Sequence, residues 1–169
     1  NLSPMQLNNR NLLNVVIGAL AETGLAARKL QLEITETVLL HNTFSTLATL
    51  HELRKLGVQI ALDDFGTGYS SLSYLRSFPF DKIKIDRSFI QDLANGDEPV
   101  AIVQAVANLA KCLNMASTAE GVETQQQMDL LQSMGCTEMQ GYLFSRARPA
   151  SEIRQFFEPA KPEKLTGAA

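Results

Sequence analysis

The sequence predicts an α/β fold in which parallel strands follow one another around part of a barrel. Segments with strand-like and helical periodicity alternate along the 169 residues, with short connections between them. A doubly wound sheet concentrates its site near one switch point, whereas a barrel places its site around the C-terminal face. The alternation alone fits either fold. The barrel is favoured because polar residues stand in or near the C-terminal ends of five consecutive predicted strands: Glu33, Asp63, Lys84, Glu120 and Gln140.

The first 63 residues alternate twice between helix and strand. Ser3 followed by Pro4 is typical of a helix start, and apolar residues at helical spacing lead to Gly24, where this helix ends. Period-two alternation predicts a strand over 30–36. The next predicted elements are a helix that begins near Phe44 and is closed by Gly57, and a strand over 58–63.

The same alternation continues toward the C-terminus. Asp97 and Glu98 followed by Pro99 open a long helix that runs to Leu113, and Gly135 ends a further helix over about 124–134. We expect one domain over 1–159 and a flexible tail over 160–169. The remaining predicted elements are a helix over 70–76, strands over 82–86, 116–119 and 139–144, and a last helix over 152–157.

Composition and charge argue against some classes of function. The net charge of −3, from 15 basic and 18 acidic residues, is too small to indicate a surface for a nucleic-acid polymer or a membrane. No apolar run reaches the roughly 18–20 residues that a membrane span needs. Cys112 and Cys136 lack the spacing of metal ligands and lie in apolar surroundings. We therefore expect both to be buried, reduced thiols, which suits a cytoplasmic protein.

Four acids and one lysine at the predicted strand ends indicate a metal site. Asp63 and Asp64 are adjacent, and a strand end that bends into a loop can direct both side chains at one ion cluster. Adjacent carboxylates repel each other unless a cation lies between them, and Glu33 and Glu120 add two further negative charges. With only Lys84 as a nearby cation, the site needs hard divalent ions such as Mg²⁺ or Mn²⁺, which prefer oxygen ligands. Two such ions favour phosphoryl chemistry, in which Lys84 would neutralise charge on the phosphate or position water.

Each of these residues also has an ordinary structural interpretation. The adjacent aspartates could form a turn or a helix cap, and Glu33 or Lys84 could lie on a solvated face of a strand. The Gly-Thr-Gly segment over 66–68 is only a weak phosphate-loop signal, because no Lys follows in the required register. His41 and His51 lie in a helical region away from the strand ends, which disfavours zinc. Each ordinary interpretation is reasonable for one residue alone. Together they are weaker, since the polar residues would have to stand at the ends of successive strands by coincidence.

Six segments together resemble the EAL-domain family of cyclic-di-GMP phosphodiesterases. They occur in the family's order and spacing, and the resemblance extends from residue 1 to about residue 157. It implies a modified TIM barrel that hydrolyses cyclic-di-GMP to linear 5′-pGpG with two Mg²⁺ or Mn²⁺ ions. The chain would supply about strands four to eight of that barrel with their helices. The matching segments are NLS (1–3), EITET (33–37), DDFGTGYSSL (63–72), KIKID (82–86), AEGVE (119–123) and QGYLF (140–144).

The resemblance also implies which residues bind the metal ions. Asn1, Glu33 and Asp63 match ligands of the first ion. Asp63 would bridge to the second ion, for which Asp64 and Glu120 match further ligands.

Other matched positions are implied to act around the ions. Lys84 matches a lysine that contacts the nucleophilic water, and Glu120 matches a residue once favoured as the general base. Glu123 and Gln140 match residues that hold metal-bound waters and the rim of the site. Glu36 matches a glutamate that fixes the loop over 64–71, which in the family couples dimerisation to metal and substrate binding. We therefore expect a homodimer through the barrel. This loop contains Phe65, Gly66, Thr67, Gly68, Tyr69 and Ser70.

The Glu-Ala-Leu sequence for which the family is named does not occur in the chain. In the family its Glu is a ligand of the first ion, and a substrate-contacting Arg follows it. We therefore expect residues 1–169 alone to have little or no activity and a longer parent protein to be the active form. The alternative is a catalytically inactive cyclic-di-GMP receptor or scaffold. The resemblance also implies an upstream diguanylate cyclase-like or sensory domain in a cytoplasmic protein, which upstream segments could anchor to a membrane.

Overall fold

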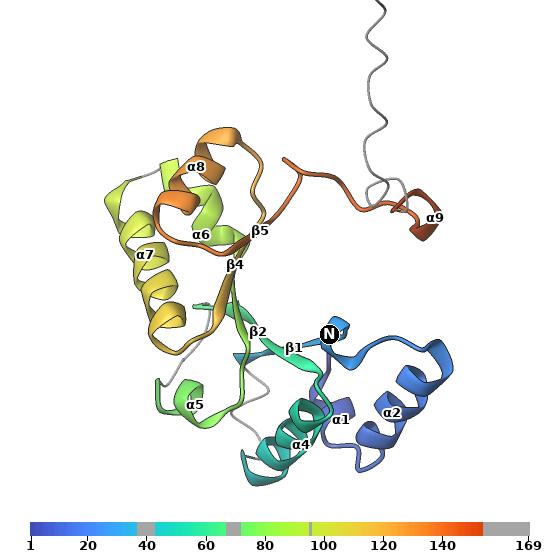
Figure 1. Ribbon diagram of the computed structural model, residues 1–169. Coiled ribbons are helices and arrows are strands. Elements are labelled where there is room, and N and C mark those ends of the chain that lie inside the picture. Colours follow the sequence, from blue (N-terminus) through green and yellow to red (C-terminus); the bar gives the residue numbers. More distant parts are fainter. Residues whose placement is uncertain (37–42, 67–71, 95, 154–169) are drawn as a thin grey trace, which may run out of the picture.

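Strands and helices alternate through the described part of the chain (Figure 1). The computed structural model describes residues 1–36, 43–66, 72–94 and 96–153. The strands are β1 (Gln31–Thr35), β2 (Gln59–Phe65), β3 (Lys82–Ile85), β4 (Ala116–Glu120) and β5 (Glu138–Gln140). The helices are α1 (Pro4–Leu7), α2 (Leu12–Thr23), α4 (Thr43–Lys55), α5 (Leu72–Ser77), α6 (Arg87–Gln91), α7 (Asp97–Cys112), α8 (Gln125–Ser133) and α9 (Ala150–Ile153), with 3₁₀ turns η1 (Ala27–Lys29) and η2 (Asp92–Ala94).

The five strands form one parallel sheet in the order β1-β2-β3-β4-β5. Spatial order therefore follows chain order, without the reversal that creates a switch point in doubly wound sheets. Thr35 pairs with Asp63 between β1 and β2, and Glu120 pairs with Gln140 between β4 and β5. All five C-terminal strand ends consequently lie along one edge, as the sequence predicts. The architecture is part of a TIM-like barrel.

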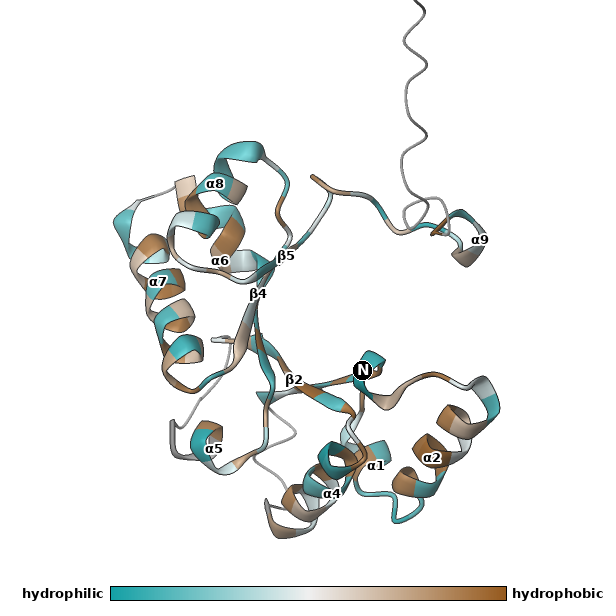
Figure 2. Cartoon of the chain, viewed as in Figure 1, coloured by the Kyte–Doolittle hydropathy of each residue, from teal (hydrophilic) through white to brown (hydrophobic). Residues whose placement is uncertain are grey.

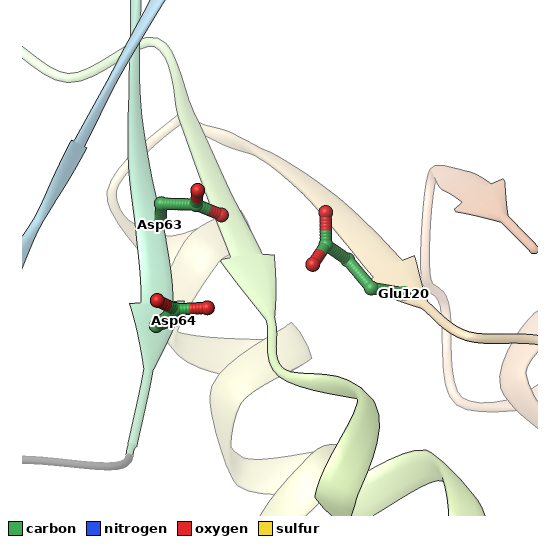
Figure 3. A group of neighbouring side chains, drawn as sticks. All are labelled: Asp63, Asp64 and Glu120. Carbon is green, nitrogen blue, oxygen red and sulfur yellow. The ribbon is translucent and has the colours of Figure 1, made fainter. Parts of the chain in front are cut away.

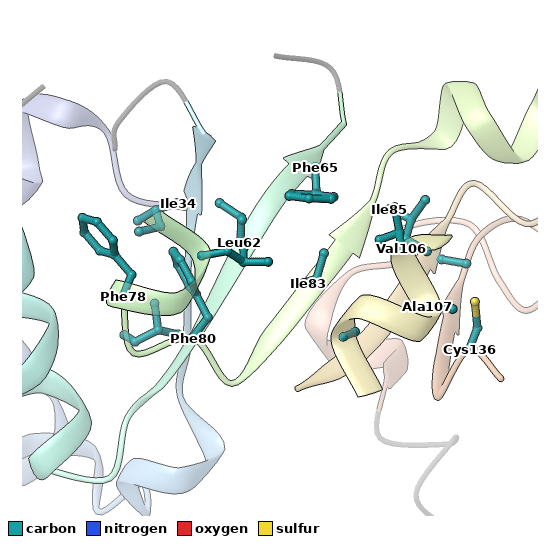
Figure 4. Packing of buried hydrophobic residues seen from close by; sticks show 14 of the residues in the cluster. Ile34, Leu62, Phe65, Phe78, Phe80, Ile83, Ile85, Val106, Ala107 and Cys136 are labelled. Atoms are coloured by element: carbon teal, nitrogen blue, oxygen red, sulfur yellow. The ribbon is translucent and has the colours of Figure 1, made fainter. Parts of the chain in front are cut away.

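The hydrophobic core lies between the central strands and the helices that cover them. Ile60 and Leu62 of β2 and Ile83 and Ile85 of β3 are at most 1% exposed. In β2 even Ala61, between the two larger residues, is buried, as expected for a parallel strand covered on both faces. Figure 4 shows Leu62, Ile83 and Ile85 among the packed side chains of this core. The central strands therefore form the most rigid base available for polar groups at their ends.

Helices pack along the outside of the sheet. α7 contacts β3 and β4, and α4 contacts β2. In α7 the buried residues Val103, Val106, Ala107 and Ala110 recur at intervals of three and four, which is the spacing of one helical face. The hydropathy colouring shows the resulting mixture of brown apolar and teal polar residues along α7 (Figure 2). Among the described residues, no helix is both long and apolar enough to cross a membrane.

The first predicted helix is interrupted. α1 begins at the predicted Ser3–Pro4 start, where the Ser3 hydroxyl accepts from the Gln6 amide and the Gln6 side chain accepts from the Ser3 amide. It ends at Leu7, and α2 starts only at Leu12. The asparagine-rich segment between them favours a turn, since the Asn9 side chain accepts a hydrogen bond from the Asn11 amide instead of extending the helix.

Two further predicted boundaries differ near the C-terminal half of the sheet. Helix α6 was not predicted, because the sequence signal assigns Asp86 to the third strand, whereas Asp86 caps this short helix. The fifth strand ends at Gln140 rather than residue 144. Gly141 packs directly against the backbone of Val122, and the Val122 carbonyl accepts from the Leu143 amide, which turns the chain away from the sheet.

The two cysteines differ in environment. Cys136 is buried, as predicted, and burial raises the pKa of its thiol. Cys112 is exposed, so the prediction that it is buried was wrong. It is the last residue of α7 and lies off the buried face of that helix.

Three predicted elements extend beyond the described residues. The helix over 70–76 is observed as α5, and the last helix is observed as α9, which begins two residues earlier than predicted. Residues 70, 71 and 154–157 of these predictions lie outside the described residues, as does the predicted tail over 160–169.

Candidate active site

A bulge in β2 brings two adjacent aspartates to the same place. Leu62 pairs with Ile83 and Phe65 pairs with Ile85, so Asp63 and Asp64 together stand opposite the single residue Lys84. Asp64 has a φ of 53°, a left-handed conformation that is uncommon for residues other than glycine. In a regular strand, neighbouring side chains point to opposite faces, and a bulge redirects them. Figure 3 shows both carboxylates beside Glu120 of β4.

Lys84 lies at the centre of the acidic cluster. Its Nζ is 2.7 Å from an oxygen of Glu120, 2.8 Å from Asp63 and 3.0 Å from Glu33. The Lys84 side chain is only 8% exposed. Burial acts to lower the pKa of Lys84, but the hydrogen bonds to the three carboxylates outweigh it and raise the pKa. The lysine therefore stays charged and links β1, β2 and β4 through their acids.

Asn1 joins the same cluster from the N-terminal end of the described chain. The Leu2 amide donates to the Glu33 carbonyl at 2.8 Å, which places residue 1 beside the end of β1. In the orientation of the Asn1 side-chain amide that allows hydrogen bonding, its nitrogen donates to Glu33 Oε2 at 3.1 Å and to Asp63 Oδ2 at 3.2 Å. The structure thus brings together all five residues that the resemblance names as ligands: Asn1, Glu33, Asp63, Asp64 and Glu120.

The cluster carries more negative charge than Lys84 neutralises. Burial raises the pKa of Glu120, and repulsion from Asp63 and Glu33 adds to this, against the opposing effect of Lys84. Burial likewise raises the pKa of Asp64, with Asp63 as the strongest repelling neighbour. One carboxylate oxygen from each of Asp63, Asp64 and Glu120 lies within 4.8 Å of the others. Hard divalent cations fit this set of oxygens and would relieve the repulsion.

Gln140 and Glu123 lie at the rim, on the β5 side of Glu120. Gln140 pairs with Glu120 across the sheet, and Glu123 follows β4, where its amide donates to Gln127 Oε1 at 2.8 Å. Both line a pocket of about 210 Å³ that also includes Glu120. Arg87 and Tyr142 line this pocket too, and neither was predicted as a site residue. Arg87 directly follows the predicted strand over 82–86, and Tyr142 lies two residues after the end of β5, so their position near strand ends is the signal that could have identified them.

The predicted coupling loop is described only at its start. Glu36 Oε1 accepts a hydrogen bond of 2.9 Å from the Gly66 amide and so connects the segment after β1 with the end of β2. Phe65 is buried, and Gly66 has a φ of 99° with the Phe89 ring against its α-carbon face. Thr67, Gly68, Tyr69 and Ser70 lie outside the described residues.

The described histidine contributes nothing to the acidic cluster. His51 lies exposed on α4, away from the strand ends, as predicted. His41 lies outside the described residues. The acidic candidate ligands that the structure describes therefore offer carboxylate oxygens.

Comparison with known proteins identifies a family to which the chain is similar. The EAL domain family model matches residues 1–147. The cyclic di-GMP phosphodiesterase NbdA of Pseudomonas aeruginosa is 44% identical over 167 residues, which cover 96% of this chain and 21% of the relative. The bifunctional diguanylate cyclase/cyclic di-GMP phosphodiesterase MucR of the same organism is 42% identical over 153 residues, which cover 90% of this chain and 22% of the relative. The chain thus spans about a fifth of the length of these curated relatives.

Solved structures with the same fold contain the dinucleotide. The chain matches the MucR phosphodiesterase in complex with c-di-GMP with a TM-score of 0.86 and 42% identity, covering 90% of this chain and 62% of that one. It matches a manganese and c-di-GMP complex of Klebsiella pneumoniae BlrP1 with a TM-score of 0.77 and 35% identity, covering 83% of this chain and 36% of that one.

Proposed function

Because the chain belongs to the EAL domain family, we propose that it forms most of the active site of a phosphodiesterase that hydrolyses cyclic-di-GMP to 5′-pGpG. The observation that carries this proposal is the gathering of Glu33, Asp63 and Glu120 around Lys84, with Asp64 and Asn1 beside them. Relatives with this activity in their names support the choice of substrate.

The acidic cluster would hold two divalent ions, Mg²⁺ or Mn²⁺. Asn1, Glu33 and Asp63 would be ligands of the first ion, and Asp63, Asp64 and Glu120 would be ligands of the second. When bound, the ions supply an activated water and offset charge on the phosphate. The close approach of the Asp63, Asp64 and Glu120 oxygens supports this ligand set.

The reaction itself adds one water to one of the two phosphodiester bonds. The water oxygen bonds to phosphorus, the bond from phosphorus to the ribose O3′ breaks, and a proton passes to that oxygen. Lys84 keeps its charge near the reacting phosphate and orients the water. Glu120 is a candidate proton acceptor, while Glu123 and Gln140 hold waters and the rim of the site.

The remaining expectations concern the longer protein. The bond between Glu36 and Gly66 supports a loop that couples a homodimer interface to the site through Phe65, Gly66, Thr67, Gly68, Tyr69 and Ser70. The two-part name of MucR supports an upstream cyclase-like domain, with a sensory domain as the alternative. We place the domain at 1–159, followed by a flexible tail over 160–169, in a cytoplasmic setting.

Residues 1–169 alone have little or no activity in this proposal, since the sequence contains no Glu-Ala-Leu ligand segment. The competing function is a receptor or scaffold that binds cyclic-di-GMP without hydrolysing it, and a full-length protein without that glutamate would favour it. The two differ in what the full-length protein does with bound dinucleotide.

The test is chromatographic detection of pGpG from cyclic-di-GMP, using the full-length protein that carries this chain and residues 1–169 separately. We expect Mg²⁺- or Mn²⁺-dependent product from the full-length protein and a loss of more than about 100-fold in Asp63→Asn, because ligand loss exceeds the 10–100-fold effect of residues that support ligands. The matched control is Asp129→Asn on the exposed surface of α8, which should retain activity.

Other outcomes are equally informative. Product formation by purified residues 1–169 would refute the predicted inactivity of the isolated chain. Tight binding of cyclic-di-GMP by the full-length protein without any pGpG would establish the receptor function instead.

A further inference from the structure

Gln31 stands directly below Glu33 on β1, and the proposed reaction makes no use of it. Residues two apart in a strand point to the same face of the sheet, about 7 Å from each other along the strand. Gln31 is half-buried, and its Nε2 donates to Glu33 Oε1 at 3.1 Å. The glutamine therefore contacts a candidate metal ligand without lying among the ligands itself.

The two carboxylate oxygens of Glu33 have different partners. Oε1 accepts from Gln31, while Oε2 lies 3.0 Å from Lys84 Nζ and 3.1 Å from the Asn1 amide nitrogen. The terminal torsion of a glutamate is broad and roughly two-fold, so a carboxylate held through one oxygen alone can swing about its last bond. Partners on both oxygens fix its plane. Gln31 thus holds Oε1 and leaves Oε2 directed at Lys84 and Asn1.

Gln31 belongs to a level of polar side chains directly below the strand-end residues of the site. The interior of a barrel of this type is usually filled by bulky branched residues. Here β3, β4 and β5 contribute Lys82, Thr118 and Glu138, each two positions before a residue of the site. These three bind one another, since Lys82 Nζ and the Thr118 hydroxyl both contact Glu138 Oε2. Among the described residues of this level, Gln31 is the one whose side chain bonds to a candidate ligand above it.

We propose that Gln31 is a positioning residue for Glu33 and that it sets the affinity of the first of the two divalent ions. Gln31 touches neither the ion nor the substrate and acts through the orientation of one carboxylate. Removing the hydrogen-bond partner of a metal ligand typically changes metal affinity or activity 10- to 100-fold. The inference rests on the proposed function, because it takes Glu33 as a ligand of the first ion only.

The experiment titrates Mn²⁺ into the metal-free full-length protein that carries this chain and follows binding by calorimetry, without substrate. Wild type should bind two ions. Gln31→Met keeps the length of the side chain but has no donor, so we expect one ion to bind about 10- to 100-fold more weakly. The other ion should keep its affinity, since Asp64 and Glu120 make no contact with Gln31 among the described residues.

Turnover gives a second measurement on the same variants. The Mg²⁺ concentration for half-maximal hydrolysis should rise by the same factor in Gln31→Met, whereas the KM for cyclic-di-GMP at saturating Mg²⁺ should match that of wild type. Gln31→Asn keeps an amide donor on a side chain one methylene shorter, so its Mn²⁺ affinity should fall between those of wild type and Gln31→Met. Urea denaturation in EDTA confirms that each variant is folded before it is titrated.

The matched control is Gln59→Met. Gln59 pairs with Gln31 between β1 and β2 and so lies at the same height in the sheet. Its side chain makes no hydrogen bond within the part of the chain that the structure describes. This variant should bind both ions as wild type does.

The titrations distinguish failure of the inference from failure of the proposed function. Unchanged affinity for both ions in folded Gln31→Met would overturn the positioning role while leaving the metal site intact. An equal loss for both ions would overturn it as well, since that is the effect of a general disturbance of the sheet. Wild-type protein that binds fewer than two divalent ions would contradict the proposed function, and the inference with it.

Discussion

Lys84 compensates the negative charge of acids that three different strands bring to one place. Its ammonium lies within 3.0 Å of carboxylate oxygens from β1, β2 and β4. An ion pair with one acid would leave the others repelling each other in a partly buried setting. Breaking a buried charge network by removing one member is costly because the remaining charges stay buried without compensation.

We therefore expect Lys84→Met to lower the free energy of unfolding by about 3 kcal/mol when no divalent ion is present. Added Mg²⁺ should reduce this loss, since a divalent cation restores positive charge among the same oxygens. Urea denaturation with EDTA and then with Mg²⁺ measures both effects. The matched control is Lys82→Met on the same strand. Among the described residues Lys82 pairs with half-exposed Glu138, so this variant should lose less than about 1 kcal/mol. Equal losses in the two variants would contradict the central role of Lys84.

Much of this cluster was predictable at the level of single residues. Strand-end placement correctly brought Glu33, Asp63, Lys84 and Glu120 to one edge. The bulge that brings Asp64 beside them was not predictable, because it depends on the register between β2 and β3, which local periodicity does not determine. Arg87 was missed because its position follows from the packing of Gly121, a contact between segments distant in sequence.

At the scale of single elements, α6 shows the limit of periodicity most clearly. A five-residue helix is too short to display an apolar face, so its sequence gives no helical signal. What defines it is its cap: Asp86 accepts from the Ser88 amide at 3.0 Å and from the Ser88 hydroxyl at 2.6 Å. Long α7 and the capped α8 were predicted correctly because both period and end signals were present. α6 contributes Arg87 to the pocket beside Glu120.

The Asp86 cap gives a pH-dependent prediction. Burial acts to raise the pKa of Asp86, but the bonds from Ser88 outweigh it and lower the pKa below that of a free aspartate. A carboxyl with a lowered folded-state pKa stabilises the fold above its unfolded pKa, and this stability is lost as pH falls through the folded value. Asp86→Ala should cost about 1 kcal/mol at neutral pH. Asp86→Asn keeps a capping oxygen and should cost less.

Denaturation across the acid range tests the sign. The stability difference between wild type and Asp86→Asn should be constant above about pH 5 and shrink below about pH 4, where Asp86 takes up its proton. A difference that instead grows on acidification would show that the folded-state pKa is raised and that the cap is not ionised.

At the scale of the whole molecule, strand pairing and burial decrease across the sheet from its centre to the β5 edge. β3 has a paired neighbour on each side and Ile83 and Ile85 are fully buried, whereas β5 contains three residues, of which Glu138 and Gln140 are exposed. Within the described residues β5 pairs with β4 alone. The alternating pattern of the sequence predicted a partial barrel but not this gradient, since the length of β5 is limited by the contact between Gly141 and Val122.

We expect amide hydrogen exchange to follow this gradient. Amides of β3 should exchange on the order of 100-fold more slowly than those of β5, because opening β3 requires loss of the core while β5 can open locally. Mass spectrometry of peptides from each strand measures the difference. Exchange of β5 as slow as that of β3 would refute a graded sheet.

The gradient also separates the two parts of the candidate site. Asp63 and Lys84 stand on the rigid strands, whereas Gln140 and Tyr142 belong to β5 and the turn after it. Cyclic-di-GMP bound in the presence of Ca²⁺ should therefore slow exchange over 138–145, which contributes to the pocket beside Glu120, and leave β3 unchanged. Peptides of α2, which lies at the other end of the sheet, serve as the control. Protection that appears equally in α2 and β5 would indicate global stabilisation by ligand, and would refute a local effect at the β5 edge.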